Sequence, residues 1–211
     1  MPTILTFGDS NTHGTPPMPS ADVILRLGPT ERWPRVMAQS LGAGWELVEE
    51  GLGGRTTVFD DPETGPLMNG GLALPMALRS HGPIDWLTIM LGTNDCQFVY
   101  GLTAEQIAAG LARLLVIANR PDLQARHGGF RVLVIAPPPV EEVGTFGREF
   151  HMGAAKSQAL PALYARLARD YGAEFMNAGD HIAISPVDGV HFDAAAHRTL
   201  GLAVADKILS F

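Results

Sequence analysis

A serine close to the N-terminus stands where a nucleophile would be expected. Ser10 follows the short apolar run Thr3–Phe7 within the sequence Gly8-Asp9-Ser10. Because Gly8 has no Cβ, the backbone can turn sharply there, which would leave the Ser10 hydroxyl above the edge of a sheet. Ser and Asp are also common helix N-caps, so the motif taken alone favours a structural role.

A histidine near the C-terminus would supply the base that such a serine requires. In Asp188-Gly189-Val190-His191 a carboxylate precedes an imidazole by three residues, close enough on one turn to hold and orient the ring. Serine is a poor nucleophile at neutral pH, and a histidine, with an unperturbed pKa of about 6.5, can accept its proton. Asp188 would fix the tautomer and stabilise the imidazolium. We therefore predict a catalytic triad of Ser10, His191 and Asp188.

Acyl transfer also needs hydrogen-bond donors for the oxyanion that develops. We predict an oxyanion hole made by the backbone N–H groups of Ser10 and Gly54 and by the side-chain amide of Asn94. Gly54 follows the apolar run Trp45–Val48, and Asn94 follows Trp86–Leu91. Each piece has a structural alternative as well, since Asn94 could cap a helix and Gly54 could belong to an ordinary turn.

Five short apolar runs predict the strands that position these residues. Several are apolar on both alternations, as expected of parallel strands buried on both faces. The runs are Thr3–Phe7, Trp45–Val48, Trp86–Leu91, Arg131–Ala136 and Glu174–Met176. Segments with helical periodicity separate them, the clearest being Thr103–Asn119, in which Thr103 and Gln106 form a capping box. Alternating strands and helices with right-handed crossovers predict a three-layer α/β/α sandwich.

Three long segments without periodicity, 13–30, 58–69 and 137–148, are predicted to be loops. Loops of this length in a compact domain are usually functional or mobile. All three would leave the C-terminal edge of the sheet, where open α/β folds bind ligands, so we expect them to form the walls of a substrate pocket. The residues expected to contact substrate are Asn11, Thr93 and Val190.

The position of the polar motifs along the chain favours catalysis over separate structural roles. They follow the first, second, third and fifth predicted strands. The carboxyl ends of parallel strands share one edge of the sheet, so this topology brings all the motifs together where an active site is expected.

Composition limits the class of protein and its partners. The chain has 211 residues, of which 46% are hydrophobic, and we interpret residues 1–211 as one domain. Fifteen Lys and Arg against 22 Asp and Glu give a net charge of -7, which disfavours nucleic acid and anionic membranes as partners. Cys96 is the only cysteine, which suits a reducing compartment. Without a signal peptide or a long apolar run, we expect a cytoplasmic protein.

The sequence resembles the SGNH (GDSL-type) hydrolase family, whose four signature blocks match in order across nearly the whole chain. The matching blocks are Gly8-Asp9-Ser10, Gly54 within Gly-Gly-Arg-Thr-Thr, Gly92-Thr93-Asn94-Asp95 and Asp188-x-x-His191. The resemblance implies a flavodoxin-like sheet of five parallel strands in the order 2-1-3-4-5. It also implies the triad and the oxyanion hole named above, with no cofactor and no metal.

More narrowly, the segments Met-Leu-Gly-Thr-Asn-Asp and Pro-Pro-Pro look like those of the bacterial arylesterase/acyltransferase branch. That resemblance implies small-molecule esters of short acyl chains as substrates, acyl transfer to alcohols or peroxide as well as to water, and a homo-oligomer. Asn11 stands where many relatives carry Leu, so acyl-chain and alcohol preferences are not implied. Thr12 replaces the second Gly of Gly-x-Ser-x-Gly, which argues against the α/β-hydrolase elbow.

Three other functions remain open from the sequence. A carbohydrate O-acetyl esterase would use the same catalytic residues with differently shaped loops. A metal-dependent hydrolase would use Asp9, Asp95, Asp188 and His191 as ligands. A non-catalytic flavodoxin-like binding module would hold a phosphorylated ligand at the first loop, although no glycine-rich phosphate-binding pattern is present.

Overall fold

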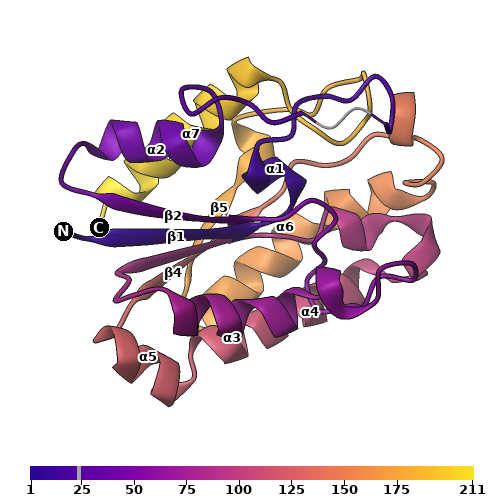
Figure 1. Cartoon of the computed structure of the whole chain (residues 1–211). Helices are drawn as coiled ribbons and strands as arrows, with labels where there is room; N and C mark the ends of the chain where they lie inside the picture. The colour runs from indigo at the N-terminus through magenta and orange to yellow at the C-terminus, as the bar shows by residue number, and fades with distance from the viewer. Residues whose placement is uncertain (23–24) are drawn as a thin grey trace.

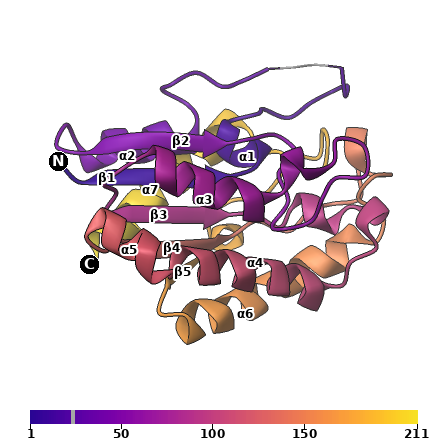
Figure 2. The same ribbon diagram turned by 60° about the horizontal axis from the view of Figure 1, so that its bottom comes forward.

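The sheet has five parallel strands in the order β2-β1-β3-β4-β5, as predicted. The structure is a computed structural model that describes residues 1–22 and 25–211. The strands are β1 (Thr3–Gly8), β2 (Glu46–Gly51), β3 (Trp86–Met90), β4 (Arg131–Ala136) and β5 (Glu174–Asn177). Figure 2 shows them stacked in this order, with β1 between β2 and β3.

Burial of the strands follows their position in the sheet. Every residue of β1 and β3 is buried, because these strands have neighbours on both sides and helices on both faces. The edge strand β2 is only partly buried and carries Glu46, Glu49 and Glu50. It begins one residue later and ends three residues later than the predicted run Trp45–Val48, since the hydrogen-bonding register with β1 continues through the pair of Gly8 and Gly51.

Helices cover both faces of the sheet and complete the predicted three layers. One face is covered by α2 and α7 and the other by α3, α4 and α6, as Figure 1 shows. The α-helices are α1 (Ser10–His13), α2 (Trp33–Leu41), α3 (Gly70–Ser80), α4 (Ala104–Ala118), α5 (Pro121–His127), α6 (Gly153–Asp170) and α7 (Ala194–Leu209). The 3-10 turns are η1 (Pro66–Met68), η2 (Asn94–Cys96), η3 (Phe98–Tyr100), η4 (Gly144–Phe146) and η5 (Ala178–Asp180).

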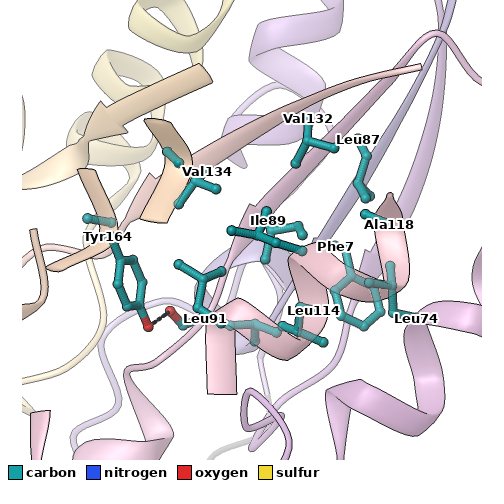
Figure 3. Packing of buried hydrophobic residues seen from close by; sticks show 14 of the residues in the cluster. Phe7, Leu74, Leu87, Ile89, Leu91, Leu114, Ala118, Val132, Val134 and Tyr164 are labelled. Atoms are coloured by element: carbon teal, nitrogen blue, oxygen red, sulfur yellow. Dashed lines mark hydrogen bonds between the residues drawn. The ribbon is translucent and has the colours of Figure 1, made fainter. Parts of the chain in front are cut away.

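Two apolar cores hold the layers together, one on each face of the sheet. Between the sheet and α3, α4 and α6, side chains such as Phe7, Ile89 and Leu114 are completely buried (Figure 3). Tyr164 reaches into the same core and donates a hydrogen bond from its hydroxyl to the Leu91 carbonyl, 3.1 Å away. This bond satisfies a polar atom that would otherwise be buried without a partner, and it ties α6 to the end of β3.

The predicted helix over 103–119 is confirmed with its capping box. Thr103 is the N-cap of α4; its hydroxyl accepts from the Gln106 N–H, and the Gln106 side chain accepts from the Thr103 N–H. Similarly, the Asp193 carboxylate accepts from the Ala196 N–H at the start of α7, 2.8 Å away. These caps satisfy N–H groups that have no partner within the helix.

Gly8 lies where the chain turns from β1 into α1, and a Cβ at this position would be obstructed, as expected from the sequence. Its φ angle is not among the positive ones. A Cβ built at this position would lie 2.0 Å from Thr12 Oγ1 and 2.8 Å from the Met90 carbonyl oxygen. Gly8 is therefore needed for close packing, because the short helix α1 lies directly against the ends of β1 and β3.

The three predicted loops are largely confirmed, with short turns inside two of them. Residues 58–69 include η1, and residues 137–148 include η4. In the segment 13–30, His13 is the last residue of α1, and residues 23 and 24 lie outside the described part of the chain. None of the helices described is both long and apolar enough to cross a bilayer.

Candidate active site

Ser10 is the first residue of α1, immediately beyond the carboxyl end of β1. Asp9 is the N-cap of this helix, and its carboxylate accepts a hydrogen bond from the Asn11 N–H, 2.9 Å away. Because the chain moves from β1 to β2 on one side and to β3 on the other, Ser10 lies at the topological switch point of the sheet. This crevice is where open α/β folds bind ligands.

The structure brings His191 to Ser10 and Asp188 to His191. The Ser10 hydroxyl lies 3.0 Å from Nε2 of His191, and Nδ1 of His191 lies 2.7 Å from Oδ2 of Asp188. All three side chains are buried, with Ser10 the most exposed at 8%. These distances allow a proton to pass from the serine to the imidazole while the carboxylate holds the other ring nitrogen.

The Asp188 carboxylate accepts hydrogen bonds at both of its oxygens. Oδ1 accepts from the N–H groups of Val190 and His191, at 3.0 and 2.9 Å, while Oδ2 accepts from the Met18 N–H at 2.7 Å in addition to the imidazole. Burial acts to raise the pKa of Asp188, but the bonds from His191 and the backbone outweigh it and lower the pKa below its usual value. The group is thus held as a carboxylate.

Met18 is a part of the site that sequence reasoning did not find. Its N–H donates to Asp188, and its carbonyl accepts from the Thr145 hydroxyl at 2.7 Å. Two loops that are 127 residues apart in the chain therefore meet at the carboxylate. No local pattern signals this contact, because it is made by a backbone group of an aperiodic loop.

The predicted oxyanion donors Ser10, Gly54 and Asn94 all line one cavity. In the described part of the chain, the Ser10 and Gly54 N–H groups have no protein acceptor. Gly54 adopts a φ of 79°, a region that favours glycine. Asn94 donates one amide hydrogen to the Arg55 carbonyl, 3.0 Å away, and its amide oxygen accepts from Gln97 at 3.4 Å. Its second amide hydrogen remains for another acceptor.

Arg55 holds the loop that carries Gly54 in place. Its side chain is buried and donates hydrogen bonds to the carbonyls of Gly8 and Glu50, the first at 3.0 Å. The guanidinium also lies 4.3 Å from the centre of the Phe7 ring, a favourable cation–π distance. Arg55 therefore connects the segment after β2 to the end of β1, beside Ser10.

Asp9 and Asp95 support the backbone of the site. Oδ1 of Asp9 is bonded to the Asn11 N–H, and Asp95 accepts from both the N–H and the hydroxyl of Thr57. Burial raises the pKa of each carboxyl to about 6. Among the residues described, no three His, Cys, Asp or Glu side chains are grouped so that they could hold a metal ion.

The cavity over Ser10 has a volume of about 400 Å³, within the usual range of small-molecule sites. Its lining is mainly apolar, with polar side chains interspersed. The lining residues are Ser10, His13, Thr15, Met18, Leu25, Gly53, Gly54, Asn94, Gln97, Phe146, Glu149, Phe150, Val190 and His191.

Of the residues expected to contact substrate, only Val190 lines this cavity. Asn11 is 1% exposed and donates its side-chain amide to the Val190 carbonyl, 3.2 Å away, so it joins α1 to the histidine loop instead. Thr93 is also buried, at 3% exposure. The predicted wall 58–69 contributes no lining residue among those described, because its turn packs against α3. Glu149 and Phe150, just beyond the predicted loop 137–148, line the cavity instead.

Comparisons with known proteins agree with this geometry. The GDSL-like Lipase/Acylhydrolase family matches residues 6–199. An aryl esterase of M. smegmatis is 38% identical, with a TM-score of 0.94 over 100% of this chain and 99% of that one. The carbohydrate acetylesterase Est24 of Sinorhizobium meliloti is 39% identical, with the same TM-score and the same coverage. No curated protein sequence matches the chain.

The match extends over most of the sequence and includes the segments that carry Ser10 and His191. The strand order 2-1-3-4-5 is that of the SGNH hydrolase fold, as the resemblance implied. A serine hydroxyl 3.0 Å from an imidazole, at the carboxyl edge of this sheet, is the catalytic pair of a carboxylic ester hydrolase. The chain belongs to the GDSL-like lipase/acylhydrolase family.

Proposed function

We propose that this protein hydrolyses short-chain carboxylic esters, with aryl or alkyl alcohol halves, through an acyl-enzyme on Ser10. The observation that carries the proposal is the 3.0 Å contact between Ser10 Oγ and His191 Nε2 inside the cavity of about 400 Å³. A cavity of this size, lined by Phe146, Phe150 and Val190, suits a small acyl group and a small alcohol.

In the first half of the reaction, Ser10 Oγ bonds to the ester carbonyl carbon while its proton passes to Nε2 of His191. The carbonyl oxygen becomes an oxyanion that accepts from the Ser10 and Gly54 N–H groups and from the free amide hydrogen of Asn94. Asp188 stabilises the imidazolium. When the tetrahedral intermediate collapses, the bond to the alcohol oxygen breaks and the imidazolium gives that oxygen its proton.

In the second half, a water molecule attacks the acyl carbon and His191 takes its proton. Collapse breaks the bond to Ser10 Oγ, which recovers a proton from His191, and the carboxylic acid leaves. An alcohol or a peroxide in the same position takes the acyl group in place of water, so the site supports acyl transfer by the same steps.

The experiment that tests this proposal combines labelling with a rate. The protein is incubated with a serine-reactive organophosphorus probe and analysed by intact and peptide mass spectrometry, alongside p-nitrophenyl acetate hydrolysis without added metal. We expect one adduct, on Ser10, and a parallel loss of turnover; Ser10→Ala should show neither adduct nor turnover. Folded protein with no adduct and no esterase activity would refute the proposal.

A second candidate is an esterase that removes O-acetyl groups from carbohydrates. It is favoured by the polar side chains of His13, Gln97 and Glu149 in the cavity lining, which can bond to sugar hydroxyls. A relative named as a carbohydrate acetylesterase is also as similar to this chain as the aryl esterase is. Comparing kcat/KM for an acetylated sugar with that for p-nitrophenyl acetate distinguishes the two functions.

A further inference from the structure

Glu149 is the only carboxylate among the described lining residues of the catalytic cavity. It belongs to the segment between η4 and α6 and is exposed. The catalytic steps above do not use it. A fixed negative charge in a largely apolar cavity influences which substrates bind, because charged groups are favoured or disfavoured according to their sign.

No cation among the described residues neutralises this carboxylate. In the part of the chain that the structure describes, Glu149 forms no ion pair with Lys, Arg or His. Partial burial and the negative charge of Glu63 both raise the pKa of Glu149, and no nearby positive charge in the described chain offsets them. The two arginines nearest His13, Arg26 and Arg32, do not line the cavity, and both bond to Glu49 instead.

Two aromatic rings share the cavity with the carboxylate. Phe150 lines the cavity and is almost fully buried. Phe146 packs edge-to-face against His191, with ring centroids 5.9 Å apart. Aromatic rings attract ammonium groups through their quadrupole. An ammonium group entering this cavity would thus meet a carboxylate and aromatic surface together, whereas a carboxylate substrate would meet repulsion.

The position of Phe146 indicates which half of the ester Glu149 faces. His191 protonates the departing alcohol, so the alcohol half must lie next to its Nε2 in the reacting complex. Phe146 packs against this ring, and Glu149 follows three residues later on the same segment. Phe146 therefore borders the alcohol half of the substrate, and Glu149 lines the same cavity.

We propose that Glu149 makes this site select esters whose alcohol half carries an ammonium group. The proposal rests on the serine esterase activity proposed above and adds the substrate class. Because Glu149 is exposed, water weakens the attraction, and we expect a contribution of about three- to fivefold in kcat/KM.

The test uses two thioesters of the same shape that differ only in charge. One is acetylthiocholine, and the other is 3,3-dimethylbutyl thioacetate, in which carbon replaces the quaternary nitrogen. The released thiol is measured with a chromogenic disulfide, which the fully buried Cys96 does not disturb. The readout is the ratio of kcat/KM for the charged thioester to that for the neutral one, at low salt and again at 1 M NaCl.

Wild type is compared with Glu149→Gln and with Asp170→Asn. The second variant removes the same unit of charge from an exposed position at the far end of α6. We expect Glu149→Gln to lower the ratio about three- to fivefold and Asp170→Asn to leave it unchanged. The ratio for wild type should fall at 1 M NaCl, where the Debye length is about 3 Å.

Failures of the two proposals are distinguishable. If wild type hydrolyses p-nitrophenyl acetate at Ser10 but Glu149→Gln leaves the ratio unchanged, the substrate class is refuted and the esterase stands. If Glu149→Gln slows a neutral acetylated sugar more than the charged thioester, Glu149 binds hydroxyl groups and the ammonium proposal is refuted. Folded wild type with no esterase activity would overturn both proposals.

Discussion

The substitution Asp188→Asn tests how the carboxylate controls His191. It preserves the shape of the side chain but replaces one accepting oxygen with a donating NH2 group. The carboxylate accepts the N–H groups of Val190 and His191 at one oxygen, and the Met18 N–H and the imidazole at the other. Wherever the NH2 group lies, it faces at least one backbone N–H.

The count of lost hydrogen bonds predicts which orientation the new side-chain amide adopts in this variant. With NH2 at the Oδ1 position, two backbone N–H groups lose their acceptor; at the Oδ2 position, only the Met18 N–H does. An unsatisfied buried donor costs about 1–3 kcal/mol. The second orientation is therefore favoured by about that amount, which corresponds to roughly five- to 150-fold in population.

The favoured orientation gives the wrong tautomer of the imidazole. The NH2 group donates to Nδ1 of His191, so the ring proton lies on Nε2 and faces the Ser10 hydroxyl. Such a ring cannot accept the serine proton. We expect kcat to fall about 10³–10⁴-fold, in line with the same change in the serine protease triad.

The assay is p-nitrophenyl acetate hydrolysis by Asp188→Asn beside wild type and Ser10→Ala, with circular dichroism to confirm folding. Nitrogen-15 NMR of the imidazole reports the tautomer directly. A loss of less than tenfold, or a ring proton found on Nδ1 of His191 in the variant, would show that Asp188 does not set the tautomer of His191. The Met18 N–H left unpaired should also lower the unfolding free energy by about 1–3 kcal/mol, measured by urea denaturation.

Three further substitutions test other parts of the structure. Asn94→Ala should reduce kcat about 10²–10³-fold if its amide is an oxyanion donor; an unchanged rate constant would remove it from that role. Tyr164→Phe should lower the unfolding free energy by about 1–2 kcal/mol, because the Leu91 carbonyl loses its buried partner, and urea denaturation would show it. Burial lowers the pKa of His197 to about 4, so the native state binds fewer protons than the unfolded chain between about pH 4 and 6.5, and stability falls as the pH falls. His197→Gln keeps an acceptor for the Trp33 N–H. It should remove about 3 kcal/mol of the loss of stability between pH 7 and pH 4, measured by urea titrations of both proteins at the two pH values. An equal loss in wild type and variant would contradict this account.

Local patterns in the sequence were enough to predict the order of the elements and the residues of the catalytic pair. Buried strands have to be apolar on both faces, and helices have to present an apolar stripe, so β1, β3 and α4 are visible as local patterns. Once the sheet is parallel, the residues after its strands share one edge. That rule placed Ser10 near His191 although 181 residues separate them.

Capping residues were predictable for the same reason, since their hydrogen bonds are made within one turn of the chain. The Thr103 and Gln106 box and the Asp193 cap depend only on residues three positions apart. Asp188 and His191 likewise lie three residues apart, and the structure joins them across this short spacing.

Contacts between distant loops could not be predicted from the sequence and follow from the tertiary structure. The Met18 N–H reaches Asp188 across 170 residues, and Asn11 turns away from the cavity to bond to the Val190 carbonyl across 179. The need for Gly8 comes in part from the Met90 carbonyl at the end of β3, a contact between strands that are distant in the sequence. Aperiodic loops carry no pattern that reveals their partners, because their path follows from the packing of the whole molecule. The same holds for Glu149, whose place in the cavity lining no periodicity in the sequence indicates.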